Sequence, residues 1–91
     1  MFIVVIYDIA DDKLRTRLHK TLRRFGEAVQ FSVFECILTA AQFAELRAAV
    51  QRVLGEEQHG IRYYDICETC RRRIVTLGTA QTTSLEPVYI I

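Results

Sequence analysis

The chain has 91 residues, of which 51% are hydrophobic, 25% charged and 10% aromatic, and its formal net charge is +1. This composition predicts one globular domain and excludes a mainly disordered chain, and no apolar stretch approaches the roughly 20 residues of a membrane span. Three cysteines are too few for a disulfide framework and no secretory signal opens the chain, so we expect a cytoplasmic protein without a membrane partner.

The first predicted element is a strand over Phe2 to Tyr7. Its residues are continuously apolar, β-branched or aromatic, which is typical of a central strand covered on both faces. Asp8 ends this strand.

A helix is predicted from Lys13 to Phe25. Asp11 and Asp12 stand where acidic side chains cap a helix and complement its dipole, and Gly26 is expected to end it. Spacings of four, four and three residues place one set of side chains on a single apolar face: Leu14, Leu18, Leu22 and Phe25.

The segment from Ala28 to Thr39 is rich in strand-forming residues but long for one strand. It predicts either one bent strand or two strands joined by a tight turn near Ser32, and periodicity alone leaves both open. Thr39 is the predicted N-cap of a second helix, Ala40 to Leu54, which Gly55 ends.

A strand is predicted from Ile61 to Cys67. Glu68 and Thr69 are expected to form a turn, and Arg72 to Leu77 the hairpin partner of that strand.

The end of the chain reads as a polar linker, Gly78 to Glu86, followed by a short apolar strand, Val88 to Ile91. Such a strand must pair with a sheet edge, in its own subunit or in a partner. We therefore divide the chain into a domain over residues 1–78 and a linker and strand over 79–91, which we expect to pair with the partner subunit.

If Ala28 to Thr39 is a hairpin, the order of elements predicts an α+β ferredoxin-like βαββαβ sandwich with an additional C-terminal strand. Both helices would then cover one face of the sheet. The other face would be left for a second subunit, so a homodimer is expected, and the small size of the domain favours the same conclusion.

Asp8 is the first candidate for chemistry, because a carboxylate at the end of a buried strand is often functional. The competing interpretation, with about equal weight, is that Asp8 only caps the following loop. Asp11 and Asp12 are interpreted as helix-start residues rather than metal ligands. A two-fold axis could bring two copies of one Asp together, and Mg²⁺ needs only one or two carboxylates besides water and phosphate oxygens.

The first helix segregates positive charge although the whole chain is nearly neutral. No acidic residue occurs between Lys13 and Arg24, and the basic side chains lie away from the leucine face: Lys13, Arg15, Arg17, His19, Lys20, Arg23 and Arg24. Such a face predicts contacts with a polyanion, with a merely solvated surface as the alternative.

Cys67 and Cys70 form a single CxxC pair. A structural zinc site needs four ligands, and a second pair could come only from another subunit. We therefore expect buried free thiols here. The sequence has no G-x-S-x-G, P-loop or H-E-x-x-H motif, so acyl-transfer chemistry and nucleotide-triphosphate hydrolysis have no support.

Three segments together resemble a known family: VVIYDIADDKLRTRLHKTLRRFG, then VQFSVFEC, then IRYYDICETC. The chain resembles, over nearly its whole length, the small CRISPR-associated endonuclease of spacer acquisition, the second Cas protein. The YDI motif with its acidic pair and basic helix, and the VQFSVFE segment, are the most specific parts of the resemblance.

The resemblance implies a ferredoxin-like homodimer in which Asp8 of each subunit faces its counterpart and the pair holds one Mg²⁺, with Mn²⁺ as the alternative cofactor. It implies a metal-dependent phosphodiesterase acting on single-stranded RNA, double-stranded DNA or both, and the central dimer of the integrase complex that adds spacers to the CRISPR array. Asp8 is thus the expected catalytic and metal-binding residue.

The other site residues follow from the same resemblance and from the basic helix. The expected nucleic-acid contacts are Arg15, Arg17, Lys13 and Lys20, and the expected supporting residues are Tyr7, Ser32 and Phe34. Ala28 stands where many members carry an arginine, which removes one phosphate contact.

Two other functions compete with the nuclease. One is a non-catalytic scaffold that binds duplex DNA within the integrase, which would use the same basic helix. The other is a small-molecule-sensing ferredoxin-like regulatory dimer, which the scarcity of glycine and the segregated arginines disfavour.

Overall fold

The computed structural model describes residues 1–57 and 59–78. The elements along the chain are β1 (Phe2–Asp8), α1 (Asp12–Leu22), β2 (Glu27–Gln30), β3 (Val33–Ile37), α2 (Ala40–Leu54), β4 (Gly60–Ile66) and α3 (Glu68–Arg71). The C-terminal linker and strand predicted over 79–91 lie outside the described residues and stay a prediction.

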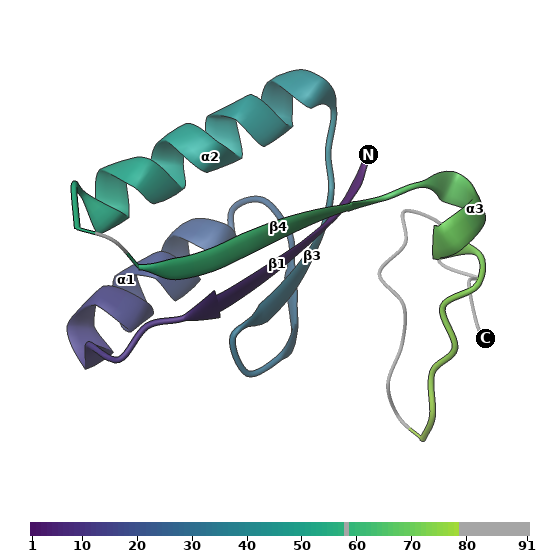
Figure 1. The fold of residues 1–91 in the computed structure, drawn as a ribbon, viewed down its shortest axis with the longest axis horizontal. Helices are drawn as coiled ribbons and strands as arrows, with labels where there is room; N and C mark the ends of the chain where they lie inside the picture. Colours follow the sequence, from purple (N-terminus) through teal and green to yellow (C-terminus); the bar gives the residue numbers. More distant parts are fainter. Residues whose placement is uncertain (58, 79–91) are drawn as a thin grey trace.

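The four strands form one antiparallel sheet in the order β2-β3-β1-β4. The helices α1 and α2 lie together on one face of this sheet (Figure 1). With one helix after β1 and one after β3, this is the predicted ferredoxin-like α+β sandwich. The core lies between the sheet and the two helices and contains Ile3, Val5, Leu18, Leu22, Phe34, Leu46 and Val50.

The segment around Ser32 resolves the choice left open by the sequence. It forms two strands, β2 and β3, and the turn between them places Ser32 in the left-handed region at φ 64°. The second helix has the predicted bounds. Thr39 caps it reciprocally with Gln42, through hydrogen bonds of 3.1 and 2.9 Å between side chain and backbone.

Helix α1 begins at Asp12, one residue before the predicted start at Lys13, and ends three residues before the predicted end. The Asp11 carboxylate accepts the Leu14 N–H at 2.8 Å and caps the helix, which ends at Leu22 rather than at Phe25. Gly26 is needed for close approach rather than for a left-handed cap. A Cβ there would lie 2.9 Å from the Cys36 Cα, and closer still to its Sγ.

The predicted hairpin after β4 is wrong. Glu68 to Arg71 form the short helix α3, and Arg72 to Leu77 form no strand. The reason is local: the Cys67 Sγ accepts the Cys70 N–H at 3.4 Å and the Cys67 carbonyl accepts the Arg71 N–H at 2.8 Å. These bonds close the chain into a helical turn, so it does not return along β4.

Among residues 1–57 and 59–78, neither α1 nor α2 covers the second face of the sheet, and Arg71 of α3 lies over Phe2 at one end of it, 5.8 Å from the ring centroid. Strand β1 is central, as predicted. Its helix-side residues Ile3, Val5 and Tyr7 are buried, whereas on the other face only Phe2, at the start of the strand, is buried. On the open face Ile6 is 39% exposed and Tyr64 is 42% exposed. The predicted cover on both faces of β1 therefore requires a second body against this surface. None of the helices within residues 1–57 and 59–78 is long and apolar enough to cross a membrane.

Candidate nucleic-acid and metal site

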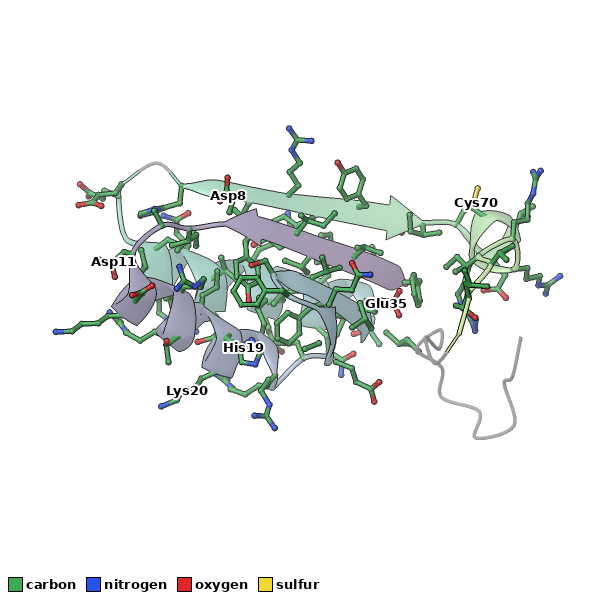
Figure 2. The ribbon with its side chains drawn as sticks, turned by 90° about the horizontal axis from the view of Figure 1, so that it is seen from below. Asp8, Asp11, His19, Lys20, Glu35 and Cys70 are labelled. Carbon is green, nitrogen blue, oxygen red and sulfur yellow. The ribbon has the colours of Figure 1, made fainter. Side chains whose placement is uncertain are left out.

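Asp8 is the last residue of β1 and lies on the open face of the sheet, on the side away from the helices (Figure 2). It is exposed, and its carboxylate forms no hydrogen bond or ion pair with another described residue. Its register partner on β4 is Gly60, where a Cβ would lie 3.7 Å from the Asp8 Cβ. Glycine therefore leaves the flank of the carboxylate free of side-chain atoms.

Tyr7, although adjacent to Asp8, lies on the helix side because side chains alternate along a strand. It is 4% exposed and stacks on Phe34, with ring centroids 6.4 Å apart. Its N–H donates to the Ser32 carbonyl at 3.1 Å. Burial raises the pKa of Tyr7, while a hydrogen bond with the Ser32 side chain and the charge of Arg15 partly offset the rise. Tyr7, Ser32 and Phe34 thus support the end of β1 from beneath.

Arg15 reaches back over the loop that follows Asp8. One guanidinium nitrogen donates to the Ile9 carbonyl at 2.8 Å and to the Ala10 carbonyl at 3.3 Å. The other nitrogen pairs with the Asp12 carboxylate. Arg15 is therefore a positioning residue for the loop, whatever contacts it makes with nucleic acid.

The remaining basic residues of α1 are available to a ligand. Lys13, Arg17 and Lys20 are exposed, and none forms an ion pair with a residue in the described part of the chain. His19 is half-buried and meets the Phe34 ring edge-on at 5.0 Å. Lys20 and His19 lie on the opposite side of the sheet from Asp8 (Figure 2).

The structure thus divides the predicted site between two faces. Asp8 stands on the open face, whereas Tyr7, Arg15, Lys20 and Ser32 line one cavity on the helix side. Within the described ranges, no three His, Cys, Asp or Glu side chains gather to hold a metal ion.

Three residues that complete these surfaces were not singled out as site residues. Gly60 bares the flank of Asp8, Phe31 is 87% exposed at the β2–β3 turn, and Arg23 lines the cavity beside Lys20. Gly60 could not be found from the sequence because only the register of β1 and β4 sets it opposite Asp8.

The three cysteines differ in burial, and the predicted burial of Cys67 and Cys70 is wrong. Cys36 is buried, and burial raises its pKa to about 11. Cys67 and Cys70 are free but exposed, because α3 stands off the end of the sheet. The Cys70 N–H and side chain lower the pKa of Cys67, and the contact with Cys67 raises that of Cys70.

The donor chemistry at Asp8 fits a hard divalent cation. Mg²⁺ prefers carboxylate oxygens and keeps several waters, and this carboxylate is solvated and free of a basic partner among the described residues. A site built on two copies of Asp8 would need a second subunit, because each chain has one Asp8.

The sequence profile of the CRISPR-associated protein Cas2 family matches residues 1–74. A CRISPR-associated endoribonuclease Cas2 of Chloroflexus aurantiacus is 37% identical over 91 residues, covering 100% of this chain and 98% of the relative. The chain belongs to the Cas2 family.

Solved structures agree with this assignment. The crystal structure of Streptococcus pyogenes Cas2 superposes with a TM-score of 0.73 at 31% identity, over 86% of this chain and all of that one. A chain of a partial Cas6-RT-Cas1–Cas2 complex shares the fold, with a TM-score of 0.73 at 24% identity over 84% of this chain and 89% of the other. The predicted Cas2 resemblance is confirmed.

Proposed function

We propose that this Cas2-family chain is a metal-dependent phosphodiesterase that cleaves single-stranded RNA, double-stranded DNA or both. In this proposal it acts during spacer acquisition as the central homodimer of the CRISPR integrase. The observation that carries the proposal is the Asp8 carboxylate at the end of β1 on the open face of the sheet, which is exposed and has no partner among the described residues. The name of the Chloroflexus relative, an endoribonuclease, supports the reaction class.

The open face supports the dimer. Asp8 shares this face with Ile6 and with Tyr64 of the neighbouring strand. A two-fold related copy packed here would cover this apolar surface and bring a second Asp8 toward the first. The metal site is then complete only in the dimer.

The Asp8 pair would hold Mg²⁺, or Mn²⁺, which when bound polarises a phosphoryl oxygen and acidifies a water. Asp8 supplies the negative charge that retains the cation. The exposed Lys13, Arg17 and Lys20 hold the phosphate backbone by charge. Arg15 keeps the loop after Asp8 in place through its two carbonyl contacts.

A scaffold that binds duplex DNA without cutting it is the second candidate. It is favoured by the fact that no hydrogen bond or ion pair joins the Asp8 carboxylate to a second titratable side chain among the described residues. The chain of similar fold in the Cas1–Cas2 complex supports a place in the integrase for either candidate.

The deciding experiment compares wild type with Asp8→Asn, and uses Asp65→Asn as a matched control for an exposed carboxylate elsewhere in the sheet. Cleavage of labelled single-stranded RNA and duplex DNA in Mg²⁺ is measured beside duplex binding and calorimetric Mn²⁺ binding. The nuclease predicts that Asp8→Asn loses cleavage and Mn²⁺ binding, whereas both variants keep duplex binding.

Equal cleavage by wild type and Asp8→Asn would overturn the role of Asp8. No cleavage by any of the three proteins, with salt-sensitive duplex binding by all, would support the scaffold instead. The dimer is checked separately with Ile6→Glu, which should give a monomer in solution.

A further inference from the structure

A cavity of about 300 Å³ opens between α1 and the β2–β3 turn, on the opposite face from Asp8. This volume is at the lower end of the range of ligand pockets, about 300–1,000 Å³. Basic, aromatic and neutral polar side chains line it together: Tyr7, Arg15, Thr16, His19, Lys20, Arg23, Gln30, Phe31 and Ser32. None of the described residues that line it is acidic, so it suits an anionic ligand of small size.

Phe31 stands at the rim of this cavity with 87% of its surface exposed. The turn that presents it is held in place by Ser32, whose left-handed backbone is unusual for a residue with a side chain. The Tyr7 N–H fixes this turn through the Ser32 carbonyl at 3.1 Å. A large apolar ring is thus held in water beside a polar cavity. Proteins that bind single-stranded nucleic acid use aromatic rings in such positions to stack unpaired bases.

Lys20 and Arg23 provide the charge. Both are exposed residues of α1 or its C-cap, and neither forms an ion pair with a residue in the described ranges. The guanidinium of Arg15, by contrast, is committed to the loop carbonyls and to Asp12. The half-buried His19 packs on Phe34 and lines the cavity between these cations and the sheet.

We propose that this cavity binds one unpaired nucleotide of a nucleic acid, with its base stacked on Phe31 and its phosphate held by Lys20 and Arg23. The inference rests on the proposed binding of nucleic acid and adds to it a site for a single-stranded end or overhang. Because the cavity and Asp8 are on opposite faces, the nucleotide held here is not the one that is cleaved.

The absence of tryptophan from the sequence allows a direct test. Phe31→Trp introduces a single indole at the cavity rim, and stacking of a base should quench its fluorescence. The probes are a short oligothymidine, a duplex with a single-stranded overhang, and the same duplex with blunt ends. We expect quenching by the first two and little by the third.

Affinity is then measured with two variants of the same position. Phe31→Tyr keeps a ring and should bind the overhang duplex like wild type. Phe31→Leu should weaken that binding roughly 5- to 150-fold, since stacking on one side chain contributes about 1–3 kcal/mol per base. Blunt-duplex binding should not change. The exposure of Phe31 makes misfolding of Phe31→Leu unexpected, and circular dichroism and thermal unfolding check this directly.

A matched pair of arginines tests the phosphate contact. Arg23→Gln should weaken binding of the overhang duplex more than Arg52→Gln, which removes the same charge from α2 outside the cavity. The nucleotide site is overturned if Phe31→Leu binds the overhang duplex as wild type does, while duplex binding and Asp8-dependent cleavage persist. Failure of the proposed nucleic-acid binding looks different: no nucleic acid then binds to any variant, including wild type.

Discussion

Comparing Arg15 with Arg17 separates a structural role from a ligand-binding role, because both arginines lie on α1 and only the Arg15 side chain has partners among the described residues. We predict that Arg15→Gln lowers the free energy of unfolding by about 2 kcal/mol. Its two bonds to the carbonyls of Ile9 and Ala10 come from a charged donor, and such bonds contribute about 1.5–3 kcal/mol when buried. The Arg15 side chain is 29% exposed, which reduces the contribution of these two hydrogen bonds. The Asp12 side chain is 87% exposed, so its ion pair with Arg15 contributes only about 0–1 kcal/mol.

Arg17→Gln should change the free energy of unfolding by less than about 0.5 kcal/mol, since Arg17 is exposed and has no ion pair with a described residue. The assay is urea unfolding at one fixed protein concentration, because dimerisation makes stability depend on concentration. Duplex binding as a function of salt completes the comparison. Loss of one phosphate contact in Arg17→Gln lowers the salt slope by about 1. Equal unfolding free energies for the two variants would refute the bracing role of Arg15.

Two further predictions concern the core and the thiols. Gly26→Ala should destabilise the fold by about 1–3 kcal/mol, measured by thermal unfolding, because the added Cβ would overlap Cys36. Adding Cys36→Ala should restore only part of the lost stability, since backbone atoms also obstruct the Cβ. Full restoration would contradict this geometry. Alkylation by iodoacetamide at neutral pH should modify Cys67 before Cys70 and leave Cys36 untouched, in line with the lowered pKa of Cys67 and the pKa of about 11 at the buried Cys36. Folding raises the pKa of Cys36, so above the ordinary thiol pKa the unfolded chain loses the thiol proton while the folded protein still retains it. The free energy of unfolding should therefore be unaffected by this group below the ordinary thiol pKa and should fall as pH rises toward 11. Mass spectrometry of partly alkylated protein gives the order, and modification of Cys36 first would contradict it.

The fold was predictable wherever one local feature decided the structure. The second helix has the predicted bounds because Thr39 caps its start and Gly55 ends it, with a positive φ of 68° that glycine adopts readily. The hairpin at Ser32 was one of two alternatives in the sequence. Residues that favour positive φ in tight turns, such as glycine or asparagine, are absent there, and the turn uses a serine instead. The C-terminal half of α1 was predicted too long because the leucine spacing continues to Phe25, while the Cα of Gly26 must approach Cys36 on β3.

The segment after β4 shows a different limit. The composition of Arg72 to Leu77 favours a strand, but Cys67 closes the chain into α3 through its carbonyl and sulfur before that segment begins. A sulfur acceptor at this position is not distinguished in the sequence from a buried thiol. The same structural cause makes Cys67 and Cys70 exposed where buried thiols were expected.

For the site, the sequence predicted which residue types matter but not which of them share a face. Tyr7 and Asp8 are neighbours in the YDI motif, yet strand alternation directs Tyr7 into the core beneath the cavity and Asp8 onto the open face. One strand end thereby serves two surfaces, a carboxylate that a second subunit can complete and a cavity formed wholly within one chain. Dimer-breaking substitutions at Ile6 should therefore abolish the metal site while leaving base stacking at Phe31 in place. If both were lost together in a folded monomer, the two surfaces would have to form a single site, and the division of labour along β1 would be wrong.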